Sequence, residues 1–176
     1  MKGSKTALVI LDAQVNMFAE GSSVFQAERL LMTIAGLVAR SRRAGIPVIF
    51  VQNNGTEGAP DMPGTPGWQI HPALAPAQTD IVIQKHTPDA FFETNLQREL
   101  SRRKIRRLVI AGFQTDLCID ATCHRAAILG YDVILVRDGH STFDSDGITA
   151  GQIIEQYNLA LRPILRLVSS GEIHFE

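Results

Sequence analysis

Short continuous apolar runs alternate along this chain with longer stretches in which apolar residues recur at intervals of three and four. The first pattern is typical of a strand that is covered on both faces, and the second indicates an amphipathic helix. The apolar runs predict strands at Thr6–Leu11, Pro47–Val51, Asp80–Gln84, Leu108–Gly112, Asp132–Val136 and Ile164–Ser169. The periodic stretches predict helices at Glu28–Ala44, Thr94–Arg103, Ala121–Leu129 and Ile148–Leu161.

The regular alternation of strands and helices predicts the fold class. Strands separated by helices form βαβ units and a parallel sheet, so we expect an α/β protein with three layers, α/β/α. The length of 176 residues suits one domain with a substantial core, and we expect a single domain over residues 1–176. Asn53–Trp68 is rich in Gly and Pro and has no periodicity, which predicts a long loop, either a lid or a subunit contact.

Polar and reactive residues follow the predicted strands. In parallel sheets the carboxyl ends of the strands meet at one edge, and ligands bind there near the point where the strand order reverses. We therefore expect these side chains to lie along one rim of the sheet. They are Asp12 and Gln14 after the first strand, Gln52 and Asn53 after the second, Lys85 after the third, Cys118 beyond the fourth and Asp138 after the fifth.

Cys118 is the candidate nucleophile. It falls where a helix begins after a buried strand, and the free N–H groups of a helix start favour a thiolate over a thiol. The plainer alternative is an inert core cysteine, because cysteine is among the most buried residue types. The second cysteine, Cys123, lies five positions later on the same predicted helix, so the two side chains diverge and we expect no disulfide.

An acid, a base and a thiol on one rim predict acyl-transfer chemistry. Cys118 would attack a carbonyl carbon, while Asp12 would take the thiol proton and return it to the leaving nitrogen. Lys85 would keep Asp12 ionised and oriented, and backbone N–H groups at Gln114 and Cys118 would bind the oxyanion. Two other interpretations stay open, a binding or scaffold subunit in which Cys118 only packs, and a redox sensor that uses the same thiol.

A pocket for a small molecule needs walls, and aromatic side chains near the rim are candidates, although most aromatic residues belong to a core. The candidate pocket residues are Gln14, Phe18, Trp68, Phe91 and Phe113.

Composition narrows the partners. A formal net charge of −1 gives no global field toward nucleic acid or an anionic membrane, so we expect neither as a partner. The apolar run Ala7–Leu11 is too short for the core of a signal peptide or a membrane span, which favours a cytoplasmic location. The five histidines have no metal-ligand spacing and no phosphate-binding glycine motif is present, so we expect no metal and no cofactor.

Three segments together resemble the isochorismatase-like cysteine hydrolases. They are the stretch from Leu8 to Gln14, Lys85 before Ala90-Phe91, and the stretch from Gly112 to Ile119. The resemblance implies a six-stranded parallel sheet of order 3-2-1-4-5-6, homodimers or larger homo-oligomers, an Asp12–Lys85–Cys118 triad, and a cis peptide bond before Gln114. In that order Asp12 and Cys118 come from neighbouring strands, whereas Lys85 must reach inward from two strands away.

The resemblance implies a reaction class without fixing the substrate. The family includes nicotinamidases, carbamoylsarcosine and ureidoacrylate amidohydrolases, and isochorismatases that cleave a vinyl ether. The metal-binding histidine pattern of nicotinamidases is replaced here by Gln52-Asn53-Asn54. The run Gly64–Pro72 resembles a branch of bacterial hydrolases of mostly unassigned substrate. An intact triad favours hydrolysis of the C–N bond of a small amide, lactam or ureide through a thioester, with vinyl ether hydrolysis as the alternative.

Overall fold

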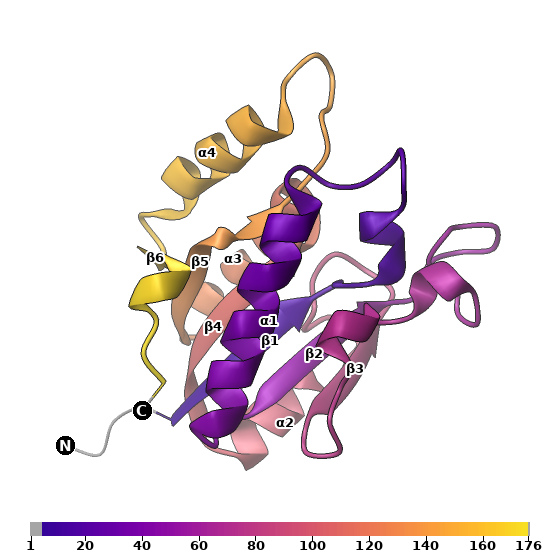
Figure 1. Ribbon diagram of the computed structural model, residues 1–176. Helices are drawn as coiled ribbons and strands as arrows, with labels where there is room; N and C mark the ends of the chain where they lie inside the picture. Colours follow the sequence, from indigo (N-terminus) through magenta and orange to yellow (C-terminus); the bar gives the residue numbers. More distant parts are fainter. Residues whose placement is uncertain (1–4, 176) are drawn as a thin grey trace.

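The computed structural model describes residues 5–175 and contains a six-stranded parallel sheet of order β3-β2-β1-β4-β5-β6, which confirms the expected fold (Figure 1). The strands are β1 Lys5–Leu11, β2 Val48–Asn53, β3 Ile81–Lys85, β4 Ile105–Phe113, β5 Asp132–Ser141 and β6 Arg166–Val168. The α-helices are α1 Ala27–Arg43, α2 Leu96–Arg102, α3 Asp120–Ile128 and α4 Ala150–Leu161. Within residues 5–175, no helix is long and apolar enough to cross a membrane.

Helices cover both faces of the sheet because the central strands are apolar on both sides. In Figure 1, α1 lies across one face, whereas α2 and α3 lie behind the other. Successive side chains of a strand point to opposite faces, so β1 divides its residues between two cores. Leu8 and Ile10 belong to the core that contains Leu30, Ile34 and Leu37 of α1.

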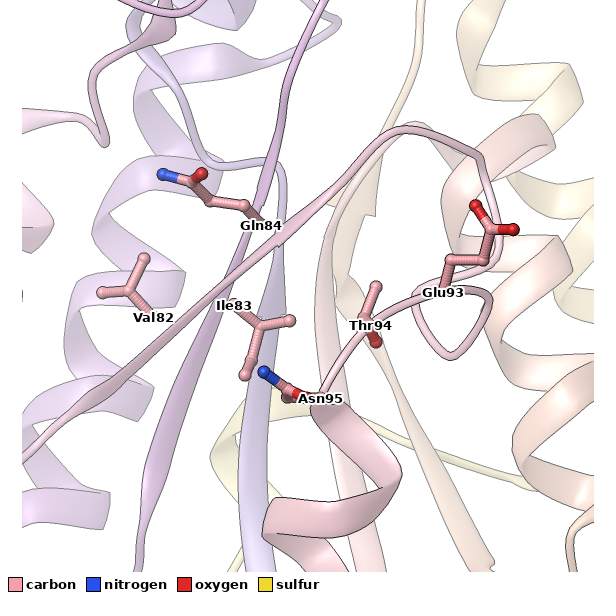
Figure 2. A pocket seen from close by; sticks show the side chains of 6 residues that line it. All are labelled: Val82, Ile83, Gln84, Glu93, Thr94 and Asn95. Carbon is pink, nitrogen blue, oxygen red and sulfur yellow. The ribbon is translucent and has the colours of Figure 1, made fainter.

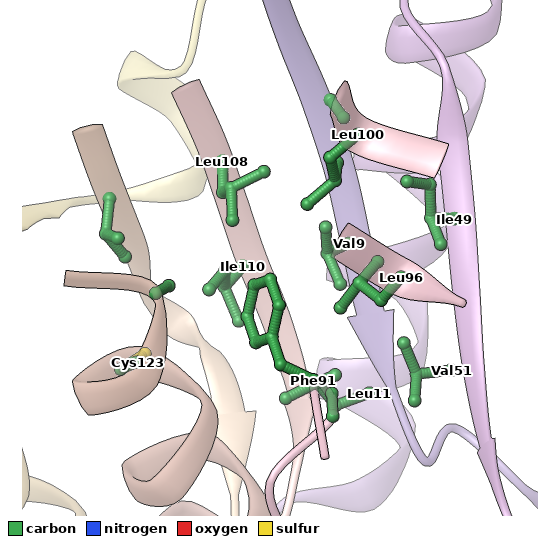
Figure 3. Packing of buried hydrophobic residues seen from close by; sticks show 14 of the residues in the cluster. Val9, Leu11, Ile49, Val51, Phe91, Leu96, Leu100, Leu108, Ile110 and Cys123 are labelled. Carbon is green, nitrogen blue, oxygen red and sulfur yellow. The ribbon is translucent and has the colours of Figure 1, made fainter. Parts of the chain in front are cut away.

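The second core lies between the sheet and helices α2 and α3 (Figure 3). Val9 and Leu11 of β1 belong to it, together with Leu96 and Leu100 of α2. Cys123 of α3 is fully buried in this core and forms no disulfide. One of the two cysteines is therefore a packing residue.

Strand β5 is longer than the sequence pattern predicts. It continues through a polar segment to Ser141, and the register shifts so that Leu135 pairs with Ile110 but His140 pairs with Gly112. Asp138 consequently lies inside β5 and not at its end. Its carboxylate accepts hydrogen bonds from the N–H and the hydroxyl of Ser170, each at 2.6 Å. The irregularity interrupts the apolar pattern on which the sequence prediction depends.

The ends of β1 and β4 approach so closely that one position has no room for a side chain. Gly112 pairs with Leu11 and has a φ of +128°, and a Cβ added there would lie 2.0 Å from the carbonyl oxygen of Leu11. Only glycine tolerates both the backbone conformation and the approach. This contact joins the strand that precedes Asp12 to the strand that leads toward Cys118.

We expect Gly112→Ala to destabilise the protein by roughly 3 kcal/mol or more, because it adds a clash with β1 to a strained φ. Gly130→Ala is the matched control, since Gly130 also has a positive φ but open space around it. It isolates the backbone strain and should cost about 1 kcal/mol. Denaturant unfolding of both variants measures the difference, and equal costs would contradict the role of the close approach.

Candidate active site

Asp12, Lys85 and Cys118 meet at the carboxyl edge of the sheet. The Lys85 Nζ lies 3.1 Å from the Asp12 Oδ2 and 3.2 Å from the Cys118 Sγ. Its third hydrogen bond, at 3.0 Å, goes to the Oδ1 of Asn53. The three N–H donors of the ammonium thus have three acceptors, although its side chain is 0% exposed.

Lys85 reaches the centre of the sheet from the edge strand. It is the last residue of β3 and pairs with Asn53 of β2, and β2 lies between β3 and β1. The lysine side chain is long enough to extend past this intervening strand end, and the Asn53 side chain supports it on the way. The distance of two strands therefore does not separate Lys85 from Asp12.

Cys118 lies in a π-helical turn, Thr115–Ile119, that joins β4 to α3. Its defining hydrogen bond runs from the Ile119 N–H to the carbonyl oxygen of Gln114 at 3.1 Å. The sequence predicted the first turn of an ordinary helix at this point, so the position agrees but the helix type differs. The peptide bond between Phe113 and Gln114 is cis, and Asp12 has a φ of +50°.

Burial and mutual attraction set the protonation of the ion pair. Burial raises the pKa of Asp12 above its usual range, and the Lys85 charge opposes this only in part. Burial alone would lower the pKa of Lys85, but the Asp12 charge and contact with Cys118 outweigh it and raise the pKa. A carboxylate with a raised pKa beside a permanent cation is suited to accept a proton and give it back.

The Cys118 thiol is protonated at neutral pH. Burial and the negative charge of Asp12 raise the pKa of Cys118 to about 12, and Lys85 opposes them only in part. Desolvation and the neighbouring carboxylate thus act against the thiolate that the helix start favours. Asp12 Oδ1 is buried and receives no hydrogen bond of normal geometry from the described residues, although the Cys118 thiol lies close enough to interact with the Asp12 carboxyl.

A buried histidine holds the turn that carries Cys118. The Nδ1 of His140 lies 2.9 Å from the Thr115 hydroxyl, and its Nε2 lies 3.0 Å from the Asn158 Oδ1 of α4. The amide oxygen can only accept, so Nε2 carries the proton and Nδ1 accepts from Thr115. Burial lowers the pKa of His140 to about 4, which keeps it neutral. The sequence showed five scattered histidines and no signal that singled out this one.

A cavity of about 330 Å³ opens over the triad, and both Asp12 and Cys118 line it. Most of its other walls come from residues that the sequence did not single out, because they lie on turns without a periodic pattern. These residues include Asn16, Met17, Asp61, His86 and Leu117, whereas Gln114, the expected oxyanion residue, also lines the cavity.

The three phenylalanines that we expected in the pocket lie outside it. Phe113 is fully buried in the core beneath α1, where Phe18 packs edge-on against it with ring centroids 5.3 Å apart. Phe91 belongs to the opposite core and stacks on Tyr131. None of the three lines the cavity, so the more common role of aromatic residues applies here.

Gln14 and Trp68 do not line the cavity either, but they fix the long loop beside it. The buried Gln14 side chain donates to the carbonyl oxygens of Asn53 and Trp68, each at 3.0 Å, and accepts from the Asn53 N–H at 2.8 Å. The Gln52 side chain also donates to the Trp68 carbonyl, and the Trp68 indole donates to Asn54. Gln52, Asn53 and Asn54, which replace the metal-binding histidine pattern of nicotinamidases, thus anchor this loop.

A second hollow lies at the edge of the sheet and is separate from the triad. Figure 2 shows Val82, Ile83 and Gln84 of β3 beside the segment that leads into α2. Glu93, Thr94 and Asn95 form its other wall. It contains no cysteine, histidine or lysine side chain.

The fold and site define an α/β/α protein with a buried Asp–Lys pair and a half-buried cysteine at the carboxyl edge of its sheet. Residues 6–158 match the model of the isochorismatase domain, and the chain belongs to the isochorismatase family. Over 138 residues it is 36% identical to a streptothricin hydrolase from Streptomyces noursei, a match that covers 78% of this chain and 50% of that protein.

Two further comparisons support the family. A ureidoacrylate amidohydrolase from Stutzerimonas stutzeri is 28% identical over 175 residues, which covers 78% of this chain and 70% of that protein. An isochorismatase structure from Pseudomonas putida KT2440 has a TM-score of 0.92 at 29% identity, covering 97% of this chain and 90% of that one. The chain spans about half the length of the streptothricin hydrolases that it matches.

We expect Cys118 to react with iodoacetamide at pH 8 on the order of 100-fold more slowly than a free cysteine, because so little of it is thiolate. Asp12→Asn removes the negative charge that helps to raise the thiol pKa, so this variant should react faster than the wild type. Mass spectrometry of alkylated peptides measures both rates and separates Cys118 from Cys123. Labelling of the wild type as fast as a free thiol at pH 7 would contradict the raised pKa of the Cys118 thiol.

We expect the free energy of unfolding to fall on acidification partly through His140. Its pKa is about 4 in the folded protein and 6.5 in an unfolded chain, so the unfolded state binds more protons between these values. The loss begins as pH falls through 6.5 and reaches roughly 3 kcal/mol by pH 4. Denaturant unfolding of His140→Gln should show a smaller pH dependence, whereas the exposed control His174→Gln should match the wild type.

Proposed function

We propose that this protein hydrolyses the C–N bond of a small amide, lactam or ureide through a thioester on Cys118. The observation that carries the proposal is the Lys85 ammonium, which bonds both Asp12 and Cys118 beneath an open cavity. A nucleophile, a carboxylate with a raised pKa and a fixed positive charge are the groups that acyl transfer requires.

In the first half-reaction, the Cys118 Sγ attacks the carbonyl carbon of the substrate. Asp12 accepts the thiol proton as the C–S bond forms, so that free thiolate need not accumulate. The C–N bond then breaks, and Asp12 returns the proton to the leaving nitrogen. The products of this half are an amine, or the amine end of an opened lactam, and an acyl thioester.

In the second half-reaction, water attacks the thioester carbon and Asp12 accepts a proton from it. The C–S bond breaks, the acid product leaves, and the sulfur recovers its proton. Lys85 keeps its charge throughout and holds the carboxylate near the sulfur. Backbone N–H groups at Gln114 and Cys118 would bind the oxyanion in both halves, typically contributing about 3 kcal/mol per donor.

Two similar proteins carry names that fit this reaction class. One is named for ureidoacrylate and is called an amidohydrolase, and the other is called a streptothricin hydrolase. The isochorismatase name of the family supports the alternative, cleavage of a vinyl ether. That reaction needs an acid to protonate the substrate but no sulfur nucleophile. Amide hydrolysis therefore requires Cys118, whereas vinyl ether hydrolysis does not.

We expect a panel of small amides and ureides to contain substrates, and intact-protein mass spectrometry to detect an acyl adduct on Cys118. Cys118→Ala should lower the rate by about 10⁴-fold or more, because it removes the attacking atom. Cys123→Ala is the matched control, since Cys123 packs in the core and should leave turnover largely intact.

Substitution of the nucleophile by an oxygen separates the two reactions. Amide hydrolysis should be lost in Cys118→Ser, whereas ether hydrolysis should survive it and be lost in Asp12→Ala. Unchanged hydrolysis of an amide in Cys118→Ala would refute the thioester route. A protein that forms no adduct and turns over no substrate would favour the binding role.

A further inference from the structure

We infer that the cavity selects substrates that carry a positive charge or N–H donors near the scissile bond, through the carboxylate of Asp61. The inference rests on the proposed function, because only a hydrolase has a substrate to select. The charge of the cavity does not depend on that function. Asp61 lies in the long loop after β2, is half-buried, and lines the same cavity as Asp12 and Cys118.

The loop presents Asp61 in a fixed position. Its Oδ2 accepts a hydrogen bond of 2.7 Å from the Asn53 Nδ2, and its backbone oxygen accepts one of 2.9 Å from the Gly55 N–H. A Cβ added to Gly55 would lie 2.1 Å from the Asp61 Oδ1, so the carboxylate packs directly against the glycine backbone. A fixed carboxylate acts on a ligand without first losing the entropy of a mobile side chain.

The negative charge of Asp61 is not neutralised by a partner. Asp61 forms no ion pair with the residues that the structure describes, and none of the residues lining the cavity is an arginine or a lysine. Lys85 lies beneath the floor and is bound to Asp12. His86 is the remaining basic group on the wall, and it is exposed.

One acceptor atom at the cavity also lacks a donor. The Oδ1 of Asn16 is buried and accepts no hydrogen bond within the described residues. Asn16 lines the cavity. A buried acceptor without a donor is unfavourable, and a ligand that brings N–H groups would relieve it. The shortage of donors and the charge of Asp61 therefore favour the same ligand chemistry.

A substrate carboxylate would meet the opposite situation. It would lose its water inside a cleft where the nearest free charge is negative, and like charges in a desolvated site repel. We therefore expect the cavity to discriminate against anionic amides and ureides.

Thiol reagents of different charge test the cavity without requiring a substrate. The probes are methyl methanethiosulfonate, its cationic 2-(trimethylammonio)ethyl form and its anionic 2-sulfonatoethyl form. Cys118 attacks the reagent sulfur, a new S–S bond forms as the reagent S–S bond breaks, methanesulfinate leaves, and the thiol proton passes to Asp12 or water. The rate of each reagent at Cys118 is divided by its rate with free 2-mercaptoethanol, which removes the reagent's intrinsic reactivity. The normalised rates then report the electrostatic potential at the cavity.

We expect the normalised rate of the cationic reagent to exceed that of the anionic reagent by tenfold or more in the wild type. Asp61→Asn keeps an acceptor for Asn53 but removes the charge, and should reduce this ratio at least threefold. Glu57→Gln removes the same charge from an exposed position of the same loop, outside the cavity, and should preserve the ratio.

A wild-type ratio of one or less would overturn the inference, as would an Asp61→Asn ratio equal to that of the wild type. Because Cys118 can react with these reagents whether or not it hydrolyses amides, the outcome is independent of turnover. A cationic preference in a protein that forms no acyl adduct would uphold the charge of the cavity and refute the thioester route.

Discussion

The structure of the site depends on one constraint, a lysine ammonium buried where water cannot reach it. Such a charge is stable only beside an opposite charge and with its remaining donors bonded, and breaking a buried pair typically costs about 3–5 kcal/mol. Asp12, Asn53 and Cys118 meet this requirement together. The groups proposed for chemistry are therefore also groups that the folded state needs, and a substitution at any of them affects both.

The strand order makes this burial possible. β1 and β4 lie side by side at the centre, and the close contact at Gly112 joins the strand ends that lead to Asp12 and to the Cys118 turn. β2 separates Lys85 from that centre, but its final residue, Asn53, is polar and offers an acceptor at the point where the lysine passes. An apolar side chain there would leave one ammonium donor without an acceptor.

Much of this could be predicted from the sequence, because the apolar runs and the strand ends carry local signals. The parallel sheet, the rim position of Asp12 and the turn position of Cys118 agree with that pattern, whereas the order of the strands was implied by the family resemblance. What the sequence missed depends on long-range contacts. The buried neutral His140 and the loop residue Asp61 have no periodicity, and the protonated state of Cys118 results from desolvation that no local motif reports. The sequence also could not show that Phe18, Phe91 and Phe113 pack in the cores and not in the cavity, because hydrophobicity alone does not distinguish a pocket wall from a core.

Asn53 connects the residue proposed for specificity to the groups proposed for chemistry. Its Nδ2 donates to Asp61 on the loop, and its Oδ1 accepts from Lys85. One amide thus positions the cavity carboxylate of Asp61 and the ammonium that is paired with Asp12. Loop changes that move Asp61 would turn this amide and withdraw its oxygen from Lys85. A change at position 61 therefore leaves the Lys85 contacts intact only if Asn53 keeps its hydrogen bond to Lys85.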